Sequence, residues 1–312
     1  MNPLQINIRP ETPADYAAIA DLQVHAFGGQ LAEAMIVTLL RHRRDFDPEL
    51  SLVAEVDHRI VGHILFTPYT MVILGEPVNA VNLAPIGVES LYQGKGIGEA
   101  LVQEGHRIAR EKGYALSFLV GYETYYVRFG YKPDMYGLAT LELRREDVQP
   151  ARYPLETRTP TEADLTSLFA LSLGEEYYVD FALQQGESLT DWISPNPNIL
   201  STVYLRDLAV VGYSRVHKDE PDKVRMFLAF DKDTAHAMVA LLMSSRQSIT
   251  LPLHPYSKSA AAFSAKPQVV PWKSALAYSL APSPFDDYAA QVEAGNRPVG
   301  RVIWPVAYDF AM

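Results

Sequence analysis

Apolar and polar residues alternate along two segments of the chain that resemble each other. Residues 52–64 alternate across a short polar turn, and residues 202–214 repeat this shape in the second half. Alternation with a period of two, interrupted by a turn, is typical of a β-hairpin with one buried face. The pattern therefore predicts one hairpin in each half of the chain.

A second similarity precedes each hairpin. Thr12 and Thr161 each stand three residues before an aspartate, Asp15 and Asp164, and Pro13 follows Thr12. This arrangement is typical of a capping box at the start of a helix, where proline is tolerated at the first position. Two similarities at nearly the same offset favour duplication of one unit over chance.

The segment between the halves indicates where they meet. Residues 147–154 contain two prolines and follow neither a helical nor a strand period. We therefore predict two domains, residues 1–148 and residues 155–312, each an α/β unit with a mixed sheet flanked by helices.

The most informative stretch lies at residues 83–102. Residues 83–88 are apolar enough for a short buried strand, but Pro85 cannot donate a ladder hydrogen bond, so the strand must be irregular near its middle. Apolar residues then recur on one helical face up to Gly113. Three glycines, Gly94, Gly96 and Gly98, therefore fall where a strand turns into a helix.

Glycines at this junction predict an anion-binding loop. They let the backbone present several N–H groups at a helix N-terminus, where partial positive charge favours a bound pyrophosphate. The spacing does not match a P-loop, because Lys95 is followed by Gly96 and not by serine or threonine. It also fits poorly to the dinucleotide fingerprint, which requires Gly-x-Gly-x-x-Gly.

Gln93-Gly94-Lys95-Gly96-Ile97-Gly98 resembles the pyrophosphate loop of the GCN5-related N-acetyltransferases (GNAT). Residues 125–131, Tyr-Tyr-Val-Arg-Phe-Gly-Tyr, are similar to the Phe-Tyr-x-x-x-Gly-Phe segment of the same superfamily. The resemblance covers most of residues 1–145, and the predicted elements follow in the family's order.

The resemblance implies a fold, a co-substrate and a set of site residues. It implies a mixed sheet whose fourth and fifth strands splay apart, with the pantetheine arm of acetyl-coenzyme A entering the gap. Tyr126 matches the tyrosine that protonates the departing thiolate, and Phe27 lies where relatives often line the acceptor pocket. The residues implied to bind acetyl-coenzyme A are Ile86, Gly87, Val88, Gln93, Gly94, Lys95, Gly96, Ile97 and Gly98.

The implied reaction is direct transfer of an acetyl group to a primary amine, without a covalent enzyme intermediate. The backbone N–H of Val88 is a candidate donor to the oxyanion. No general base is assigned: the position that carries a glutamate in several relatives is Asn82 here, which cannot accept a proton. Glu89, Glu123, a backbone carbonyl with a water chain and the terminal carboxylate of Met312 remain alternatives.

Composition narrows the class of protein. The formal net charge of -10 argues against wrapping nucleic-acid phosphates and favours a positively charged or neutral partner, such as a small amine. The absence of cysteine excludes thiol nucleophiles and cysteine-ligated metals, and the eight histidines show no ligand spacing, so we predict no metal site. The first residues lack a basic stretch followed by an apolar segment, and no apolar run approaches the roughly 18 residues of a membrane span, so we expect a cytoplasmic protein.

The second half lacks a glycine loop at the matching junction. Residues 231–236 contain two aspartates there, which would repel a pyrophosphate, so we predict a degenerate GNAT-like domain that does not bind coenzyme A. Two alternatives remain open for the whole chain: a non-catalytic sensor or scaffold that binds acyl-coenzyme A, and an acyltransferase with a longer acyl chain or an oxygen acceptor. The sequence leaves the acceptor and the oligomeric state, including a homo-oligomer, undetermined.

Overall fold

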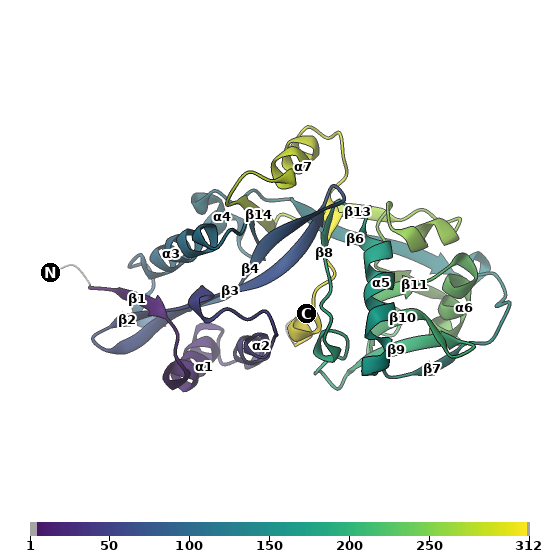
Figure 1. Ribbon diagram of the computed structural model, residues 1–312, viewed down its shortest axis with the longest axis horizontal. Helices are drawn as coiled ribbons and strands as arrows, with labels where there is room; N and C mark the ends of the chain where they lie inside the picture. The colour runs from purple at the N-terminus through teal and green to yellow at the C-terminus, as the bar shows by residue number, and fades with distance from the viewer. Residues whose placement is uncertain (1–4, 311–312) are drawn as a thin grey trace.

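A computed structural model describes residues 5–310 and contains three sheets (Figure 1). The first sheet holds the glycine-loop half of the chain. Its strand order is β1 (Asn7–Pro10), β2 (Ser51–Val56), β3 (Arg59–Ile73), β4 (Glu76–Val88), β5 (Leu116–Val120) and β14 (Ala275–Ser279), with β8 (Phe181–Leu183) paired to the far end of β3. The neighbours are antiparallel except β4 and β5, which are parallel. The predicted mixed sheet is confirmed.

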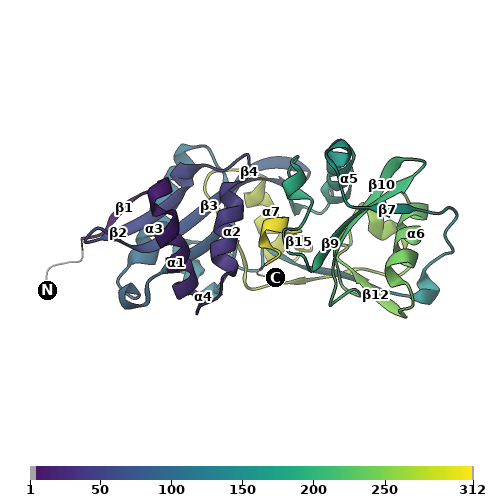
Figure 2. The same ribbon diagram turned by 90° about the horizontal axis from the view of Figure 1, so that it is seen from below.

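Two smaller sheets consist mostly of strands from the second half. One has the order β11 (Val224–Ala229), β10 (Ala209–His217), β9 (Ile199–Arg206) and β7 (Glu156–Arg158). The other has the order β12 (Ser248–Leu251), β6 (Tyr136–Arg144) and β13 (Gln268–Pro271), with β15 (Gly300–Arg301) parallel to β6. The sheet of β7, β9, β10 and β11 lies at the opposite end of the molecule from β1 and β2, and β13 and β15 lie nearer the middle (Figures 1 and 2).

Helices cover both faces of the first sheet. The helices α1 (Tyr16–Ala26) and α2 (Ala32–Arg41) lie on one side, and α3 (Ile97–Glu111) lies on the other (Figure 1). Apolar side chains of α3, including Leu101 and Val102, pack with residues of β2, β3 and β4 in one core cluster. The remaining α-helices are α4 (Glu123–Tyr126), α5 (Leu165–Glu176), α6 (Lys232–Met243) and α7 (Pro284–Glu293).

The two halves repeat one plan. The antiparallel order β1-β2-β3-β4 corresponds to β7-β9-β10-β11, and α3 and α6 follow β4 and β11 respectively. Both predicted hairpins are confirmed, as β2 with β3 and β9 with β10. The capping boxes at Thr12 and Thr161 are also confirmed, each at a 3-10 turn, η1 (Pro13–Asp15) or η6 (Glu162–Asp164), that leads into α1 or α5.

Strands cross the predicted boundary in both directions. β14, from the second half, pairs with the outer edge of β5, and β6, from the first half, forms the middle of the third sheet. The first and third sheets therefore each contain a strand from the other half, whereas the second sheet does not. The physical reason is that an exposed edge strand leaves N–H and C=O groups unpaired, and any strand of suitable length can satisfy them. A division at residues 148–155 follows the repeat along the sequence but not the pairing of the strands.

The irregular strand predicted at Pro85 is confirmed. The register between β3 and β4 shifts where Ile64 pairs with Ile86 but Phe66 pairs with Leu83, so the strand bulges at residues 84–85. The pairing of β4 with β5 covers only Ala80 to Asn82. Beyond Asn82 the two neighbouring strands separate, and this opening leads to the site.

Candidate acyl-coenzyme A site

The glycine loop lies at the N-terminus of α3. A 3-10 turn, η3 (Ser90–Tyr92), precedes it, and Gly96 forms the N-cap with a φ of 83°. A Cβ atom at Gly94 or Gly96 would meet no atom within 4 Å, so the positive φ and not crowding favours glycine here. Within residues 5–310 no side chain caps this helix end. The first N–H groups of α3 therefore lack a side-chain acceptor and suit an anion.

Side chains hold the loop in place from outside. The Gln93 amide donates a hydrogen bond to the Val88 carbonyl oxygen at 3.0 Å, which ties the loop to the end of β4. The Lys95 ammonium lies 4.9 Å from the centre of the Tyr92 ring. Ile97 is buried beneath the loop in the core of the first sheet.

A large cavity joins this loop to the opening between β4 and β5. Its volume is about 1020 Å³. Of the predicted residues, Phe27, Ile86, Val88, Gln93, Gly94, Gly96, Ile97, Gly98 and Tyr126 line it. Gly87 and Lys95 are not among its lining residues. Gly87 instead faces α1, because a Cβ there would lie 2.8 Å from the Gln23 side-chain oxygen.

Tyr125 and Tyr126 enter the cavity from the short helix α4. The Tyr126 ring lies against Gly121, and a Cβ at that position would overlap the ring. Tyr126 is 7% exposed, and burial, with a smaller contribution from Tyr125, raises its pKa well above the usual tyrosine value. The phenol is therefore protonated at neutral pH, which is the state that a proton donor requires. Burial raises the pKa of Tyr125 as well, and its hydroxyl lies against Gly98.

The comparisons with known proteins agree with this geometry. Residues 7–133 match the family model of the acetyltransferase (GNAT) domain. The N-acetyltransferase YhbS of Escherichia coli, uncharacterised, is 36% identical over 126 residues, which are 40% of this chain and 72% of that protein. The chain belongs to the GNAT acetyltransferase family.

Two further relatives define how far the similarity extends. The uncharacterised N-acetyltransferase YjhQ of Escherichia coli is 37% identical over 123 residues, and the chain spans 66% of its length, just under two thirds. A GCN5-related N-acetyltransferase from Kribbella flavida has the same fold over 88% of this chain and 71% of its own, with a TM-score of 0.68 and 17% identity. The sequence match therefore lies in the first half, whereas the likeness in fold extends into the second.

The second half of this GNAT protein contributes three aromatic residues that the sequence did not indicate. Trp272, Trp304 and Tyr308 line the cavity although they lie far from the glycine loop in sequence. The Trp304 ring stacks on Phe118 of β5, with 6.0 Å between ring centres. Tyr308, in the 3-10 turn η9 (Val306–Tyr308), donates a hydrogen bond to the side-chain oxygen of Asn82 at 2.7 Å. Figure 2 shows this C-terminal segment beside α2, between the two halves.

These contacts give the Asn82 side chain a structural role. Its amide nitrogen also donates to the Phe118 carbonyl at 2.9 Å, so both ends of the side chain are engaged. The amide of Asn82 joins β4, β5 and the C-terminal segment. No local pattern could have revealed this, because the partners are 36 and 226 residues away.

The candidate bases differ in where they lie. Glu89 and Glu123 are half-buried and do not line the cavity, and Met312 lies outside the described residues. Glu33 of α2, which no sequence motif marks, does line it. Its Oε2 atom is buried and has no hydrogen-bond partner among residues 5–310.

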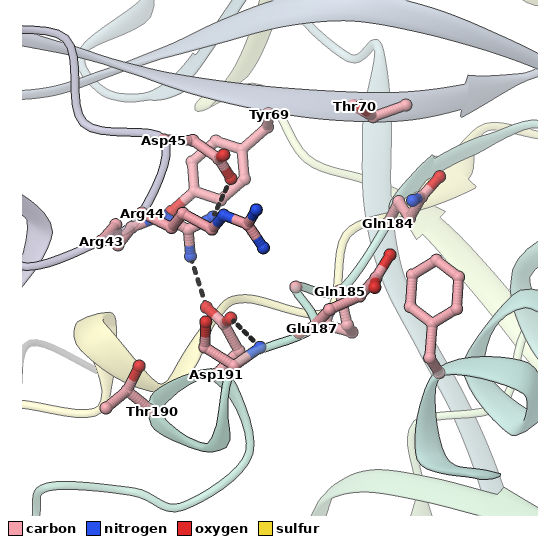
Figure 3. A pocket seen from close by; sticks show the side chains of 13 residues that line it. Arg43, Arg44, Asp45, Tyr69, Thr70, Gln184, Gln185, Glu187, Thr190 and Asp191 are labelled. Carbon is pink, nitrogen blue, oxygen red and sulfur yellow. Dashed lines mark hydrogen bonds and ion pairs between the residues drawn. The ribbon is translucent and has the colours of Figure 1, made fainter. Parts of the chain in front are cut away.

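A second, smaller cavity of about 310 Å³ lies where the halves meet (Figure 3). Arg43 and Asp191 point toward one another there, at 2.7 Å, and the Arg43 guanidinium lies 4.5 Å from the centre of the Tyr69 ring. Asp191 belongs to η7 (Leu189–Asp191) of the second half, so this ion pair joins the two halves. None of the predicted site residues lines this cavity. No helix within residues 5–310 is both long and apolar enough to cross a membrane.

Proposed function

We propose that the protein transfers an acetyl group from acetyl-coenzyme A to a primary amine by direct attack. The observation that carries this proposal is one continuous cavity that contains the glycine loop, the end of β4 and the buried tyrosine Tyr126. Family membership supports acyl transfer from an acyl-coenzyme A. The proposal adds that the acyl group is acetyl and that the acceptor is an amine.

The pyrophosphate and the pantetheine arm of acetyl-coenzyme A require different groups of the protein. The N–H groups at the start of α3 suit the pyrophosphate, since this helix end has no side-chain cap within the described residues. The backbone of Ile86 to Val88 lies beside the opening between β4 and β5 and suits the amide groups of the pantetheine arm. The Val88 N–H is the proposed donor to the oxyanion.

The reaction breaks one bond and forms one. The neutral amine nitrogen attacks the thioester carbonyl carbon and forms a C–N bond, and the C–S bond then breaks with its electron pair on sulfur. Tyr126 donates a proton to the sulfur, the nitrogen loses one proton to water, and water returns one proton to the tyrosine oxygen. Acetylated amine and free coenzyme A are the products, and the protein is regenerated.

Replacing the proposed proton donor tests this assignment. Tyr126→Phe removes the hydroxyl but keeps the ring that packs on Gly121, so we expect kcat to fall about a hundredfold. The affinity for acetyl-coenzyme A should change less than twofold, because the loop is untouched. Release of coenzyme A thiol measures turnover, and calorimetric titration measures binding.

Two further variants make the test specific. Tyr178→Phe, at an exposed tyrosine of the second half, should leave both quantities unchanged. Tyr125→Phe should retain turnover. Loss of turnover in Tyr125→Phe but not in Tyr126→Phe would show that Tyr125, and not Tyr126, is the proton donor. Tight binding of acetyl-coenzyme A without turnover in the wild type, over a panel of amines, would favour the non-catalytic sensor. A series of acyl-coenzyme A thioesters of increasing length separates the acetyl transferase from one using a longer chain.

A further inference from the structure

Outside the glycine loop, the large cavity has several aromatic and apolar lining residues. They come from the C-terminal end of α1, from α2, from the segment after β5 and from the C-terminal part of the second half. They are Phe27, Ile36, Tyr122, Trp272, Trp304 and Tyr308. Apolar faces of this kind favour contact with a flat or apolar body over contact with a hydroxyl-rich one.

One carboxylate of the same cavity has a buried oxygen with no hydrogen-bond partner among residues 5–310. Glu33 of α2 has neither a hydrogen bond to Oε2 nor an ion pair within residues 5–310, although that oxygen is shielded from water. The other two charged lining residues, Glu99 and Arg128, lie 3.6 Å apart and offset each other's charge. A buried carboxylate oxygen without a donor is costly, and a cationic ligand would supply the donor.

We propose that the acceptor is a cationic amine with an apolar or aromatic body, and that Glu33 determines this specificity by binding the ammonium group. This inference rests on the proposed function, since it concerns the acceptor of the same reaction. The aromatic rings contact the body of the amine, and their faces add attraction for its charge. The amine binds in its ammonium form and loses a proton to water before its nitrogen attacks.

The geometry gives the second half a role in this specificity. Trp304 and Tyr308 are fixed by Phe118 and Asn82 of the first sheet, so the C-terminal segment forms one wall of the acceptor site. The second half therefore contributes to the active cavity of the first and does not merely brace it.

A comparison of acceptors tests the predicted class. The probes are 2-phenylethylamine, hexylamine and glucosamine, each assayed by release of coenzyme A thiol. We expect kcat/KM for 2-phenylethylamine to exceed that for glucosamine at least tenfold. Equal values, or a preference for glucosamine, would overturn the inference while leaving the acetyltransferase intact.

The Glu33→Gln variant tests the residue. We expect the KM for 2-phenylethylamine to rise at least tenfold, with kcat within threefold and acetyl-coenzyme A affinity unchanged. Asp21→Asn, which removes the same charge from an exposed position of α1, is the matched control and should change none of these. An unchanged KM in Glu33→Gln would contradict the assignment.

A second variant, at a partly exposed position, tests the proposal even if Glu33→Gln fails to fold. Phe27 is 37% exposed, so Phe27→Ala removes a ring from the cavity wall at little cost to the core. We expect the preference for 2-phenylethylamine over methylamine to fall about fivefold, and an unchanged preference would count against the aromatic wall.

Failure of the proposed function has a separate signature. If acetyl-coenzyme A binds but no amine is acetylated, calorimetric titration with 2-phenylethylamine itself decides the matter. Binding that is lost in Glu33→Gln would support the ligand site although the transferase proposal had failed. The absence of binding in the wild type would overturn the ligand site.

Discussion

The two halves share a strand order but differ at the junction where a helix follows the fourth strand. In the first half, Gly96 caps α3 with a left-handed backbone and no side-chain hydrogen bond. In the second half, Asp231 caps α6, and its carboxylate accepts a hydrogen bond from the Thr234 N–H at 2.7 Å. The same carboxylate also contacts Tyr153 at 3.2 Å and Arg206 at 3.4 Å. One helix end is open to an anion, whereas the other is already satisfied by its own chain.

The comparison indicates that this fold alone does not create a binding site for a pyrophosphate. The docking of the helix is alike in both halves: Gly62 lies against Ile97 of α3, and Gly212 lies against Met238 of α6. What differs is the charge and the backbone conformation of a few residues at the helix N-terminus. We therefore expect one molecule of acetyl-coenzyme A to bind per chain.

The largest expected effect comes from making the first junction resemble the second. Gly96→Asp places a carboxylate at the N-cap and imposes a side chain on a positive φ. We expect the affinity for acetyl-coenzyme A to fall about a thousandfold, or roughly 4 kcal/mol. Calorimetric titration measures both the affinity and the stoichiometry.

The reverse change in the second half is the control. Asp231→Gly removes the side-chain cap of α6 and should lower stability by only about a few tenths of a kcal/mol, because glycine is itself tolerated at an N-cap. It should leave one binding site per chain with unchanged affinity. A stoichiometry of two in the wild type would contradict the comparison, because the second half would then bind a coenzyme as well.

The next prediction concerns two buried carboxylates, one in each half, whose pKa values are shifted in opposite directions. In the first half, burial would raise the pKa of Glu11, but hydrogen bonds from His63 and Arg41 prevail and lower it to about 2. In the second half, burial and the neighbouring Glu176 raise the pKa of Glu175 to about 7. Glu11 thus stabilises the fold above its unfolded pKa of 4.5, and this contribution is lost as the pH falls toward 2.

The contribution of Glu175 to stability has the opposite pH dependence. The folded state retains its proton up to about pH 7, whereas the unfolded chain loses it near pH 4.5. Its contribution is therefore full below pH 4.5 and is lost as the pH rises to 7, by roughly 2 to 3 kcal/mol. Urea unfolding midpoints of Glu175→Gln should lack this fall between pH 4.5 and 7. A parallel pH profile in the variant and the wild type would refute the assignment to Glu175.

The smallest effect concerns the repeated helix caps. Asp15 binds Arg9 at 2.7 Å and the Thr12 N–H at 2.7 Å, and Asp164 binds Arg158 at 2.6 Å and the Thr161 N–H at 2.7 Å. Because the geometry is repeated, Asp15→Ala and Asp164→Ala, which remove the acceptor oxygens, should each lower stability by about 1 kcal/mol. Both arginines are partly exposed, so their ion pairs add little. Clearly unequal losses in unfolding midpoint would show that the two caps are not equivalent.

Much of the site followed from local sequence. Gln93 to Gly98, Pro85 and Tyr126 lie within about 45 residues of one another, and each has a local signature: a glycine spacing, a missing donor or an aromatic segment. Their roles in binding and catalysis remain predictions. Glu33, Trp272, Trp304 and Tyr308 had no such signature, because an isolated glutamate or tryptophan looks the same on any surface.

The sequence by itself determined the elements: two hairpins, two capped helices, the irregular strand and the glycine junction. These depend on hydrogen bonds and side-chain patterns within about a dozen residues. Only the tertiary structure decided that β14 completes the first sheet and β6 the third, and that Tyr308 reaches Asn82. The reason is physical: an edge strand accepts any suitable partner, and a cavity wall is defined by proximity in space, which the local pattern does not encode.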